Sequence, residues 1–327
     1  MITPDARDAL HRLLADRVRF EVPMSRLTSL RVGGPAAAVA TPADRVELAA
    51  LLRLCAEHGI PHLTLGAGFN TLATDRGFGG VVIQLSRFRA IEERPGGGLR
   101  VEVGASHSQV TRFCVERGLS GLEFAAGIPG TVGGWLAMNA GVPDREMKDV
   151  VQEIEVLSPT GRSFQHVPAG VLGFVYRDLR GLAPGSVIVS ALLRVTADDP
   201  DEVRAEVDRL LARRAATQPL NVPSCGSVFK NPHGDFAGRL IEASGLKGHC
   251  IGGAQISPVH ANFIANTGGA TASDVLSLIR ETQRRVREQT GKHLEREVRI
   301  VGGPETRPGS QATAPASDRE ATANQPD

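Results

Sequence analysis

The stretch EFAAGIPGTVGGWLAMNAG, residues 123–141, contains more glycine than a packed core requires. Its glycines are Gly127, Gly130, Gly133, Gly134 and Gly141. Pro129 stiffens the turn among them, and the stretch follows a strand-rich α/β sequence. Because glycine lets backbone N–H groups approach an anion closely, we interpret residues 123–141 as a candidate phosphate or dinucleotide loop.

A second glycine turn occurs earlier, in LTLGAGFNTL at residues 63–72. Gly66 and Gly68 follow an expected strand, but Thr71 stands where a Rossmann fingerprint has its third glycine. The chain also contains no Walker-type phosphate loop. Two such loops suit the two ends of a dinucleotide such as FAD, and the alternative is a pair of tight turns at a domain interface.

Helix and strand patterns alternate around these loops. In residues 42–59, Asp44 can cap a helix that carries one apolar stripe and stops at Gly59. Further helices are expected at residues 106–118, 199–214, 236–245 and 273–290. Strands are expected at residues 60–65, 80–85, 99–105, 186–195, 250–257, 261–266 and 296–303, and a hairpin at 151–167. The sequence therefore predicts a mixed α and β protein without internal repeats.

Composition excludes several classes of protein. The 327 residues include 37 Lys and Arg against 36 Asp and Glu, so no overall field attracts nucleic acid or an anionic membrane. No apolar run is long enough for a membrane span, and the first ten residues lack the apolar core of a secretory signal. The four cysteines form no CxxC pair, which argues against zinc and against a disulfide scaffold. We therefore expect a cytoplasmic protein that binds no metal.

Several motifs occur together in one order and spacing. They are TSLRVGGPA (28–36), LGAGFN (65–70), GLEFAAGIPGTVGG (121–134), MNAG (138–141), VYR (175–177), PSCGSVFKNP (223–232), HANFIAN (260–266) and EREVRIVG (295–302). This combination resembles the UDP-N-acetylenolpyruvoylglucosamine reductase (MurB) family of bacterial peptidoglycan synthesis, over about residues 20–303. The short connection after Arg177 resembles the compact second type of that family.

The resemblance implies an α+β fold with three parts. A two-subdomain FAD-binding module of the vanillyl-alcohol-oxidase-like (PCMH) type is expected at residues 1–87 and 88–215. A C-terminal α/β substrate-binding domain is expected at residues 216–303, whose last strand can rejoin the first subdomain. Residues 304–327 have no large apolar side chain and are expected to form a disordered tail.

The resemblance also implies the cofactors and the substrate. FAD is expected to bind non-covalently and NADPH to supply electrons, and the reaction converts UDP-N-acetylglucosamine enolpyruvate to UDP-N-acetylmuramate. No nucleic acid or membrane partner is expected, and the protein is expected to be a monomer. The residues that match the family's cofactor motifs are Arg31, Gly66, Ala67, Gly68, Phe69, Asn70, Thr71, Gly127, Ile128, Pro129, Gly130, Thr131, Val132, Gly133, Gly134, Asn139, Ala140 and Gly141.

Three residues match the family's catalytic positions. Reduction of an enolpyruvyl group needs positive charge or donors where anionic charge develops, and a proton source on carbon. Arg177 matches the arginine and Glu297 the glutamate that stabilise this charge. Ser227 matches the proton donor, since a serine hydroxyl donates only to something as basic as a carbanion. Without the resemblance, Arg177 is better explained by a surface salt bridge with Asp178, and Glu297 by an exposed pair with Arg299 on the same face of an alternating strand.

The segment SCGSVFKNP, residues 224–232, contains other polar groups. Ser224 and Cys225 have no catalytic counterpart in the family, and Cys225 is expected to be a small packed residue. The residues expected to contact substrate are Tyr176, Lys230, Asn231 and His260. Lys230 and Asn231 could instead lie in a solvated turn.

Three departures from the family pattern affect local contacts. Leu179 replaces a common serine, residues 142–144 read VPD instead of Ala-Tyr-Gly, and a basic contact cannot be assigned between Arg213 and Arg214. Two other functions stay open: a different FAD oxidoreductase with the same module, and a nucleotide-sugar-binding protein without turnover.

Overall fold

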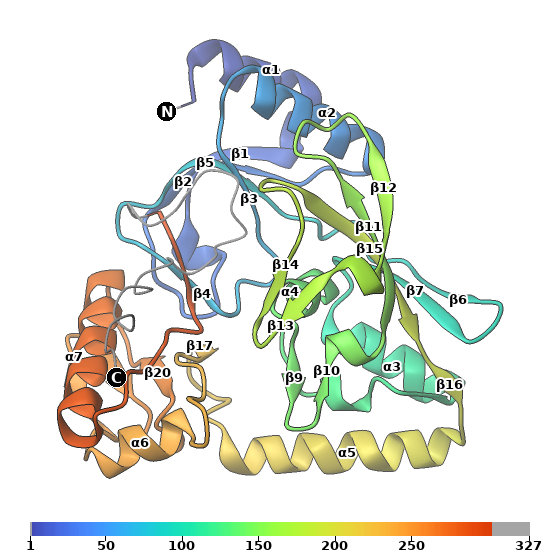
Figure 1. Cartoon of the computed structure of the whole chain (residues 1–327). Coiled ribbons are helices and arrows are strands. Elements are labelled where there is room, and N and C mark those ends of the chain that lie inside the picture. The colour runs from blue at the N-terminus through green and yellow to red at the C-terminus, as the bar shows by residue number, and fades with distance from the viewer. Residues whose placement is uncertain (1, 303–327) are drawn as a thin grey trace, which may run out of the picture.

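A computed structural model describes residues 2–302, so the expected tail at residues 304–327 lies outside the described residues. Two sheets occupy the upper and right parts of the molecule in Figure 1, and a C-terminal part occupies the lower left. Helix α5 (Pro200–Thr217) runs along the bottom and connects the second sheet to the C-terminal part. Asp199 caps α5 by accepting a hydrogen bond from the Asp201 N–H group.

The first sheet combines antiparallel and parallel pairing. Its strands, in sheet order, are β1 (Val18–Pro23), β2 (Pro35–Ala40), β5 (Phe78–Ile83) and β3 (His62–Thr64). Only the β1–β2 pair is antiparallel. Helices α1 (Pro4–Leu14) and α2 (Arg45–Glu57) lie together above it in Figure 1. Asp44 caps α2 as expected, and the predicted stripe is buried: Leu48, Leu51, Leu52 and Cys55.

The second sheet is antiparallel throughout. Its strands, in sheet order, are β12 (Phe164–Pro168), β11 (Val151–Leu157), β15 (Val187–Arg194), β7 (Gly98–Glu102) and β6 (Ile91–Arg94). The β11–β12 pair is the hairpin expected from the sequence. Helix α3 (His107–Arg117) begins at a capping box formed by Ser106 and Gln109, and it ends at Gly118 in the left-handed conformation. The short helix α4 (Val132–Ala137) lies within the glycine-rich stretch 123–141.

The C-terminal part is a small sheet covered by two helices. Its strands, in sheet order, are β17 (Ser224–Ser227), β20 (Phe263–Asn266), β19 (Ala254–Ile256) and β18 (Cys250–Ile251). Helices α6 (Ala237–Ala243) and α7 (Ala272–Thr290) accompany it. The final strand β21 (Arg299–Val301) leaves this part and pairs in parallel with β4 (Thr71–Ala73). The domain boundaries given above stay a prediction.

Short elements complete the described chain. They are β8 (Leu119–Ser120), β9 (Gly141–Val142), β10 (Arg145–Glu146), β13 (Gly173–Val175), β14 (Asp178–Arg180), β16 (Thr196–Ala197) and the 3₁₀ turns η1 (Ala15–Arg17), η2 (Met24–Arg26), η3 (Glu123–Ala125), η4 (Met147–Asp149) and η5 (Ala169–Val171). Two of the pairs, β9–β10 and β13–β14, are two-stranded hairpins. Their turns and strands carry residues of the site described below.

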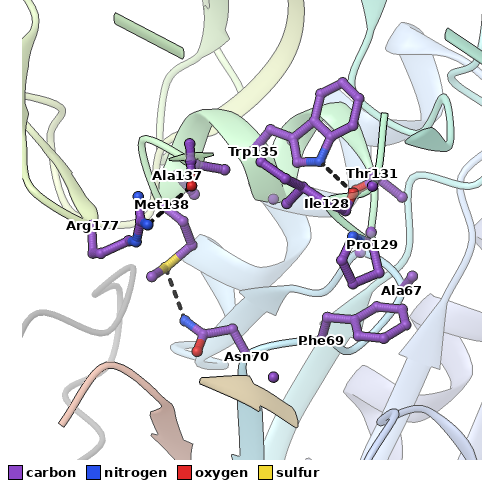
Figure 2. Close-up of a pocket in the computed structure, with 18 of the residues that line it drawn as sticks. Ala67, Phe69, Asn70, Ile128, Pro129, Thr131, Trp135, Ala137, Met138 and Arg177 are labelled. Atoms are coloured by element: carbon purple, nitrogen blue, oxygen red, sulfur yellow. Dashed lines mark hydrogen bonds between the residues drawn. The ribbon is translucent and has the colours of Figure 1, made fainter. Parts of the chain in front are cut away.

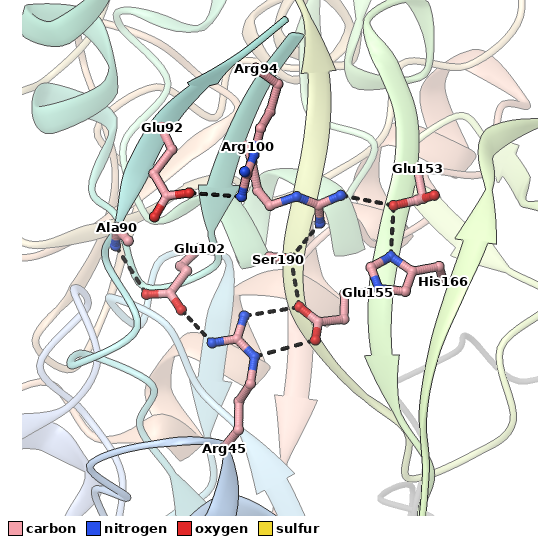
Figure 3. Close-up of polar contacts among 10 residues, drawn as sticks. All are labelled: Arg45, Ala90, Glu92, Arg94, Arg100, Glu102, Glu153, Glu155, His166 and Ser190. Carbon is pink, nitrogen blue, oxygen red and sulfur yellow. Dashed lines mark hydrogen bonds and ion pairs between the residues drawn. The ribbon is translucent and has the colours of Figure 1, made fainter.

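A polar network joins helix α2 to the second sheet (Figure 3). Arg45 donates to Glu102 at 2.8 Å and to Glu155 at 2.9 Å, and Ser190 donates to the same Glu155 carboxylate at 2.8 Å. Apolar contacts accompany this network, because one core cluster extends from α1 and α2 through the second sheet. The two sheets are therefore held together by both apolar packing and ionic contacts.

Candidate active site

The two glycine loops face one large cavity of about 1470 Å³. This exceeds the ~300–1,000 Å³ of an ordinary small-molecule pocket. The predicted cofactor residues that line it are Gly66, Ala67, Gly68, Phe69, Asn70, Thr71, Gly127, Ile128, Pro129, Gly130, Thr131, Gly133, Gly134, Ala140 and Gly141. Figure 2 shows Phe69 and Pro129 across the cavity from Arg177. The cavity therefore has room for a dinucleotide and a second ligand.

Glycine is required where the first loop turns. Gly68 has a φ of +71°, and a Cβ atom there would collide with the Leu27 carbonyl oxygen. A Cβ atom on Gly66 would overlap the Thr131 hydroxyl, so the two loops contact each other at this point. The glycines let both loops form one wall of the cavity.

The backbone of both loops presents free donors. Among the described residues, no acceptor binds the N–H groups of Gly66, Ala67, Gly68 and Phe69 in the first loop. The N–H groups of Gly130, Thr131 and Gly134 in the second loop likewise have no acceptor in the described part of the chain. Successive free N–H groups form a concave donor surface that binds anions such as a diphosphate. The residues therefore fit a dinucleotide such as FAD.

The polar groups of Asn70 form hydrogen bonds within the protein. Its N–H group donates to the Cys225 carbonyl, and its side chain donates to the Glu297 carbonyl at 3.2 Å and to the Met138 sulfur at 3.1 Å (Figure 2). The Arg299 N–H group donates to the Asn70 carbonyl. Asn70 therefore connects the first glycine loop to strands β17 and β21.

Three residues predicted to bind the cofactor do not line the cavity. Arg31 is exposed, Val132 is part of the apolar core, and Asn139 is fully buried. The Asn139 side chain donates to Glu146 and to the Val175 carbonyl and accepts from the Lys148 N–H group. These bonds satisfy Asn139 within the protein. A cofactor contact by any of the three stays a prediction.

Arg177 lies in the turn between β13 and β14, with a φ of +58°. Left-handed backbone is unfavourable for a residue with a side chain and is often retained at functional sites. The guanidinium donates from Nη2 to the Gly141 carbonyl at 3.0 Å, and its Nε lies 3.4 Å from Glu297 Oε1. The side chain is 18% exposed. Arg177 is thus a half-buried cation at the cavity, and the expected surface pair with Asp178 does not form, because Asp178 pairs with Arg180 and Arg299.

Glu297 precedes β21 and points into the same cavity. Its N–H group donates to the Val228 carbonyl at 2.8 Å, which holds it beside strand β17. Burial raises the pKa of the Glu297 carboxyl to about 7, although the charges of Arg177 and Lys230 oppose this shift. The alternation expected for this strand holds in part, because Val298 packs in the core while Glu297 and Arg299 line the cavity.

Ser227 ends strand β17 and lines the cavity beside Glu297. The register of β17 against β20 shifts between Ser224 and Ser227, where Gly226 has a φ of +82°. Such a bulge redirects a side chain. The Ser227 hydroxyl makes no hydrogen bond to any residue within 2–302. It is therefore available to a ligand.

Cys225 is buried, as expected from the sequence. Desolvation raises the pKa of its thiol to about 12. A thiol with that pKa stays protonated near neutral pH and is a poor nucleophile. This agrees with a packing role for Cys225.

A second cavity of about 500 Å³ adjoins the first. The residues that line both cavities are Arg177, Ser227, Asn231, Phe236, His260 and Glu297. Tyr176 lines the second cavity alone. Lys230 lines neither, because its ammonium group pairs with Glu295 at 2.7 Å. Three of the four predicted substrate residues therefore lie at the smaller cavity.

The hydrogen bonds of Asn231 and His260 limit what each can offer a ligand. The Asn231 oxygen accepts from the Ala237 N–H group at the start of α6. The His260 Nδ1 atom accepts from the Asn262 N–H group at 3.2 Å. Because that nitrogen is an acceptor, the proton of the neutral ring belongs on Nε2. Burial lowers the pKa of His260, which favours this neutral form.

Sequence reasoning missed Arg299 and did not choose between Arg213 and Arg214. Arg299 is half-buried and donates to the Ala137 carbonyl at 2.8 Å and to Asp178 at 3.2 Å. Arg213 and Arg214 both line the large cavity, but only Arg214 is half-buried, and desolvation lowers its pKa. The alternation Glu297–Arg299 along one strand was the signal for Arg299, because it places both side chains on one face.

Two departures from the family pattern have structural explanations. Leu179 is buried in the core shared by the two sheets, so an apolar side chain suits that position. Pro143 and Asp144 form the turn of the β9–β10 hairpin, with Asp144 at a φ of +70°. The VPD segment therefore forms a tight hairpin at the cavity wall.

The described residues provide no group of His, Cys, Asp and Glu that could hold a metal ion. Between residues 2 and 302, none of the helices combines the length and the apolar character needed to cross a membrane.

The fold and the cavity define an FAD-binding flavoprotein with an additional C-terminal domain. A family model described as FAD binding domain matches residues 36–165, and the model of the UDP-N-acetylenolpyruvoylglucosamine reductase C-terminal domain matches residues 218–301. The chain belongs to the UDP-N-acetylenolpyruvoylglucosamine reductase family. The predicted fold class and family are thereby confirmed.

Similar proteins cover nearly the whole chain. UDP-N-acetylenolpyruvoylglucosamine reductase of Anaeromyxobacter sp. (strain K) is 47% identical over 296 residues, which cover 90% of this chain and 89% of that protein. The enzyme of the same name from Geobacter metallireducens is 46% identical, over 90% of this chain and 99% of its own. A crystal structure of the reductase from Thermus caldophilus superposes with a TM-score of 0.75 at 36% identity, covering 87% of this chain and 100% of that one.

Proposed function

We propose that this chain reduces UDP-N-acetylglucosamine enolpyruvate to UDP-N-acetylmuramate, with NADPH as electron donor. The observation that carries the proposal is the meeting of Arg177, Ser227 and Glu297 in one cavity, below two glycine loops with free N–H groups. Hydride-transfer chemistry would be supplied by bound FAD, with NADPH as the source of the electrons. The free N–H groups of Gly66–Phe69 and of Gly130, Thr131 and Gly134 would hold its diphosphate.

Arg177 and Glu297 would stabilise the negative charge that develops on the substrate. Hydride addition to the methylene carbon of the enolpyruvyl group moves an electron pair toward its carboxylate, which gives an enolate. The forked guanidinium of Arg177 matches a planar carboxylate. The raised pKa of Glu297 supports a protonated carboxyl group that can donate a hydrogen bond to the same charge.

Ser227 would deliver the proton to the adjacent carbon of the enolate. Its hydroxyl has no partner among the described residues, so donation breaks no protein hydrogen bond. A strongly basic carbanion can take a proton from a serine hydroxyl, and no base is needed to activate the side chain. The proton-donor role therefore needs only the placement of Ser227 beside the reacting carbon.

The smaller cavity would bind the UDP-sugar part of the substrate. Asn231 and His260 line both cavities and can contact polar groups there, and Tyr176 supplies an aromatic face. Lys230 would act through its charge, because its ammonium group is already paired. We also propose a cytoplasmic location, where nucleotide-linked sugars are made, and a monomeric state.

Anaerobic half-reactions test this function. The purified protein should be yellow with bound flavin, NADPH should bleach it, and UDP-N-acetylglucosamine enolpyruvate should then restore the colour rapidly. A protein that binds flavin but is not reoxidised by this substrate would be a different oxidoreductase. A protein that takes up no flavin on reconstitution but binds UDP-sugars would be a binding protein without turnover.

A further inference from the structure

Arg177 has a second carboxylate neighbour besides Glu297. Its Nη1 atom lies 3.7 Å from Glu146 Oε1, and the exposed fractions of the two side chains are 18% and 15%. Partial burial strengthens such an attraction relative to water. Glu297 lines both cavities, but Glu146 lines neither. Glu146 therefore acts on Arg177 from outside the space that a ligand would occupy.

Glu146 is itself held in place by Asn139. The Asn139 Nδ2 group donates to Glu146 Oε2 at 2.9 Å and to the Val175 carbonyl at 3.1 Å. The Lys148 ammonium group pairs with the same Oε2 atom at 2.9 Å, so Glu146 has a second positive neighbour besides Arg177. Val175 is the last residue of β13, directly before the turn that carries Arg177. Because Asn139 is fully buried, these bonds are costly to lose. Asn139 thus connects the Glu146 carboxylate to the strand that leads into Arg177.

The β9–β10 hairpin supplies a second acceptor for the same guanidinium. Glu146 pairs with Gly141 across this hairpin, and the Gly141 carbonyl accepts from Arg177 Nη2 at 3.0 Å. The backbone of Glu146 is set by a capping box with Asp149, whose carboxylate accepts from the Glu146 N–H group at 2.7 Å. The hairpin therefore holds the Gly141 carbonyl and the Glu146 carboxylate at fixed positions relative to each other, and both face the Arg177 guanidinium.

We propose that Glu146, held by Asn139, is a positioning residue that orients the Arg177 guanidinium toward an anionic ligand in the cavity. An arginine has five N–H groups, and two of the Arg177 nitrogens donate to backbone carbonyls: Nη1 to Asn139 at 3.5 Å and Nη2 to Gly141 at 3.0 Å. The carboxylates of Glu146 and Glu297 attract the same guanidinium and so restrict which N–H groups can face the ligand. The identity of that ligand, the carboxylate of the substrate, rests on the proposed function.

Removal of the Glu146 charge has two physical consequences. The guanidinium loses one of the two carboxylates that hold it, so its direction is less restricted. Glu297 also becomes the sole carboxylate within ion-pair distance of Arg177 among the described residues, so the Arg177 charge is no longer shared with Glu146. The charged groups that act on Glu297 are Arg177 and Lys230, and both favour its ionised form. The pKa of Glu297 should therefore fall when Glu146 is neutralised.

The test uses the flavin-loaded protein with E146Q, and Asp149→Asn as the matched control. The glutamine oxygen can still accept from Asn139, so flavin content, melting temperature and reduction by NADPH should equal those of the wild type. Reoxidation by the enolpyruvyl substrate should slow on the order of 10- to 100-fold, because a misplaced group costs that much. Calorimetric binding of UDP-N-acetylmuramate to the oxidised protein should weaken, and the alkaline limb of reoxidation should move to lower pH. D149N removes a neighbouring carboxylate charge, but its amide oxygen can still accept from the Glu146 N–H group, so it should match the wild type.

Wild-type binding and reoxidation in E146Q would overturn the inference, as would an equal loss in D149N. A drop in melting temperature that accompanies the slower reoxidation would also count against it, because it would indicate a structural role. If E146Q does not fold, Glu146→Asp replaces it, since the shorter carboxylate keeps the charge but withdraws it from Arg177. Failure of the proposed function has a different signature: the wild-type protein itself would not be reoxidised by the substrate.

Discussion

The Nε atom of Arg177 lies 3.4 Å from Oε1 of Glu297, with both side chains largely withdrawn from water. Two opposing effects act on this pair. Burial favours a neutral Glu297, and the Arg177 charge favours an ionised one. The result is a pKa of about 7 for Glu297, so the carboxyl group can exist in either form near neutral pH. A carboxyl group with a pKa near neutral pH can gain or lose a proton as charge develops on a bound ligand.

The shape of the Arg177 side chain should matter as much as its charge. In Arg177→Lys the single ammonium group cannot contact both the Gly141 carbonyl and a ligand carboxylate in the forked geometry. We expect reduction of the flavin by NADPH to persist and reoxidation by substrate to be slow. Arg180→Lys, at an exposed position of the same hairpin, is the control. Normal turnover of the Arg177 variant would show that the guanidinium is not needed.

The raised pKa of Glu297 predicts a pH-dependent stability. Between pH 4.5 and about 7 the unfolded chain releases the Glu297 proton while the folded protein retains it. The contribution of Glu297 to the free energy of unfolding therefore falls as pH rises through this window, by at most about 3 kcal/mol, and is constant above it. Glu297→Gln should remove this component in urea unfolding at about pH 5 and about pH 8. Glu288→Gln, on the exposed surface of α7, is the control and should retain this pH dependence. If Glu297→Gln shows the same pH dependence of unfolding as the wild type, the raised pKa of Glu297 is refuted.

Ser227→Ala should separate the two half-reactions. Flavin reduction by NADPH should be normal, and reoxidation by substrate should slow on the order of 10²–10⁴-fold because a general acid is missing. Ser224→Ala and Cys225→Ala, in the same strand, serve as controls and should retain most activity. Stopped-flow absorbance of the flavin measures both steps. Normal reoxidation in Ser227→Ala would mean that the proton comes from another group.

The first glycine loop should not tolerate a side chain at Gly68. In Gly68→Ala the new Cβ atom would collide with the Leu27 carbonyl at a backbone conformation that alanine rarely adopts. We expect the purified variant to contain much less flavin than the wild type, as measured by absorbance. Gly79→Ala is the matched control, because nothing lies within 4 Å of its Cβ position and its φ is ordinary. Equal flavin content in both variants would argue against the loop as a cofactor site.

The network of Figure 3 should stabilise the contact between α2 and the second sheet. Arg45→Ala leaves the buried Glu155 carboxylate with only Ser190, so the free energy of unfolding should fall by about 1–3 kcal/mol. The expected loss is moderate because the Arg45 side chain is 41% exposed, so that solvent screens its charge. The loss should shrink at low pH as Glu155 becomes protonated. Arg94→Ala breaks an exposed pair and should cost almost nothing, and equal losses in both variants would contradict the role of burial.

The helices and the glycine loops could be predicted because their signals are local. The Asp44 cap, the apolar stripe of α2 and the left-handed stop at Gly118 depend on residues a few positions apart. The final strand was expected over residues 296–303 but is observed only at Arg299–Val301, because its partner is the short strand β4. Strand length depends on the neighbour in the sheet, which no local pattern specifies.

The sequence by itself determined which residues could carry the chemistry, because residue type and motif order suffice for that. Only the tertiary structure decided which of them share a cavity: Lys230 pairs with Glu295, and Asn139 turns inward to hold Glu146. It also placed Glu297 where water is scarce, whereas the isolated motif suggested an exposed ion pair. Burial and charge proximity arise from segments far apart in the chain, so the pKa of Glu297 and the setting of Arg177 exist only after folding.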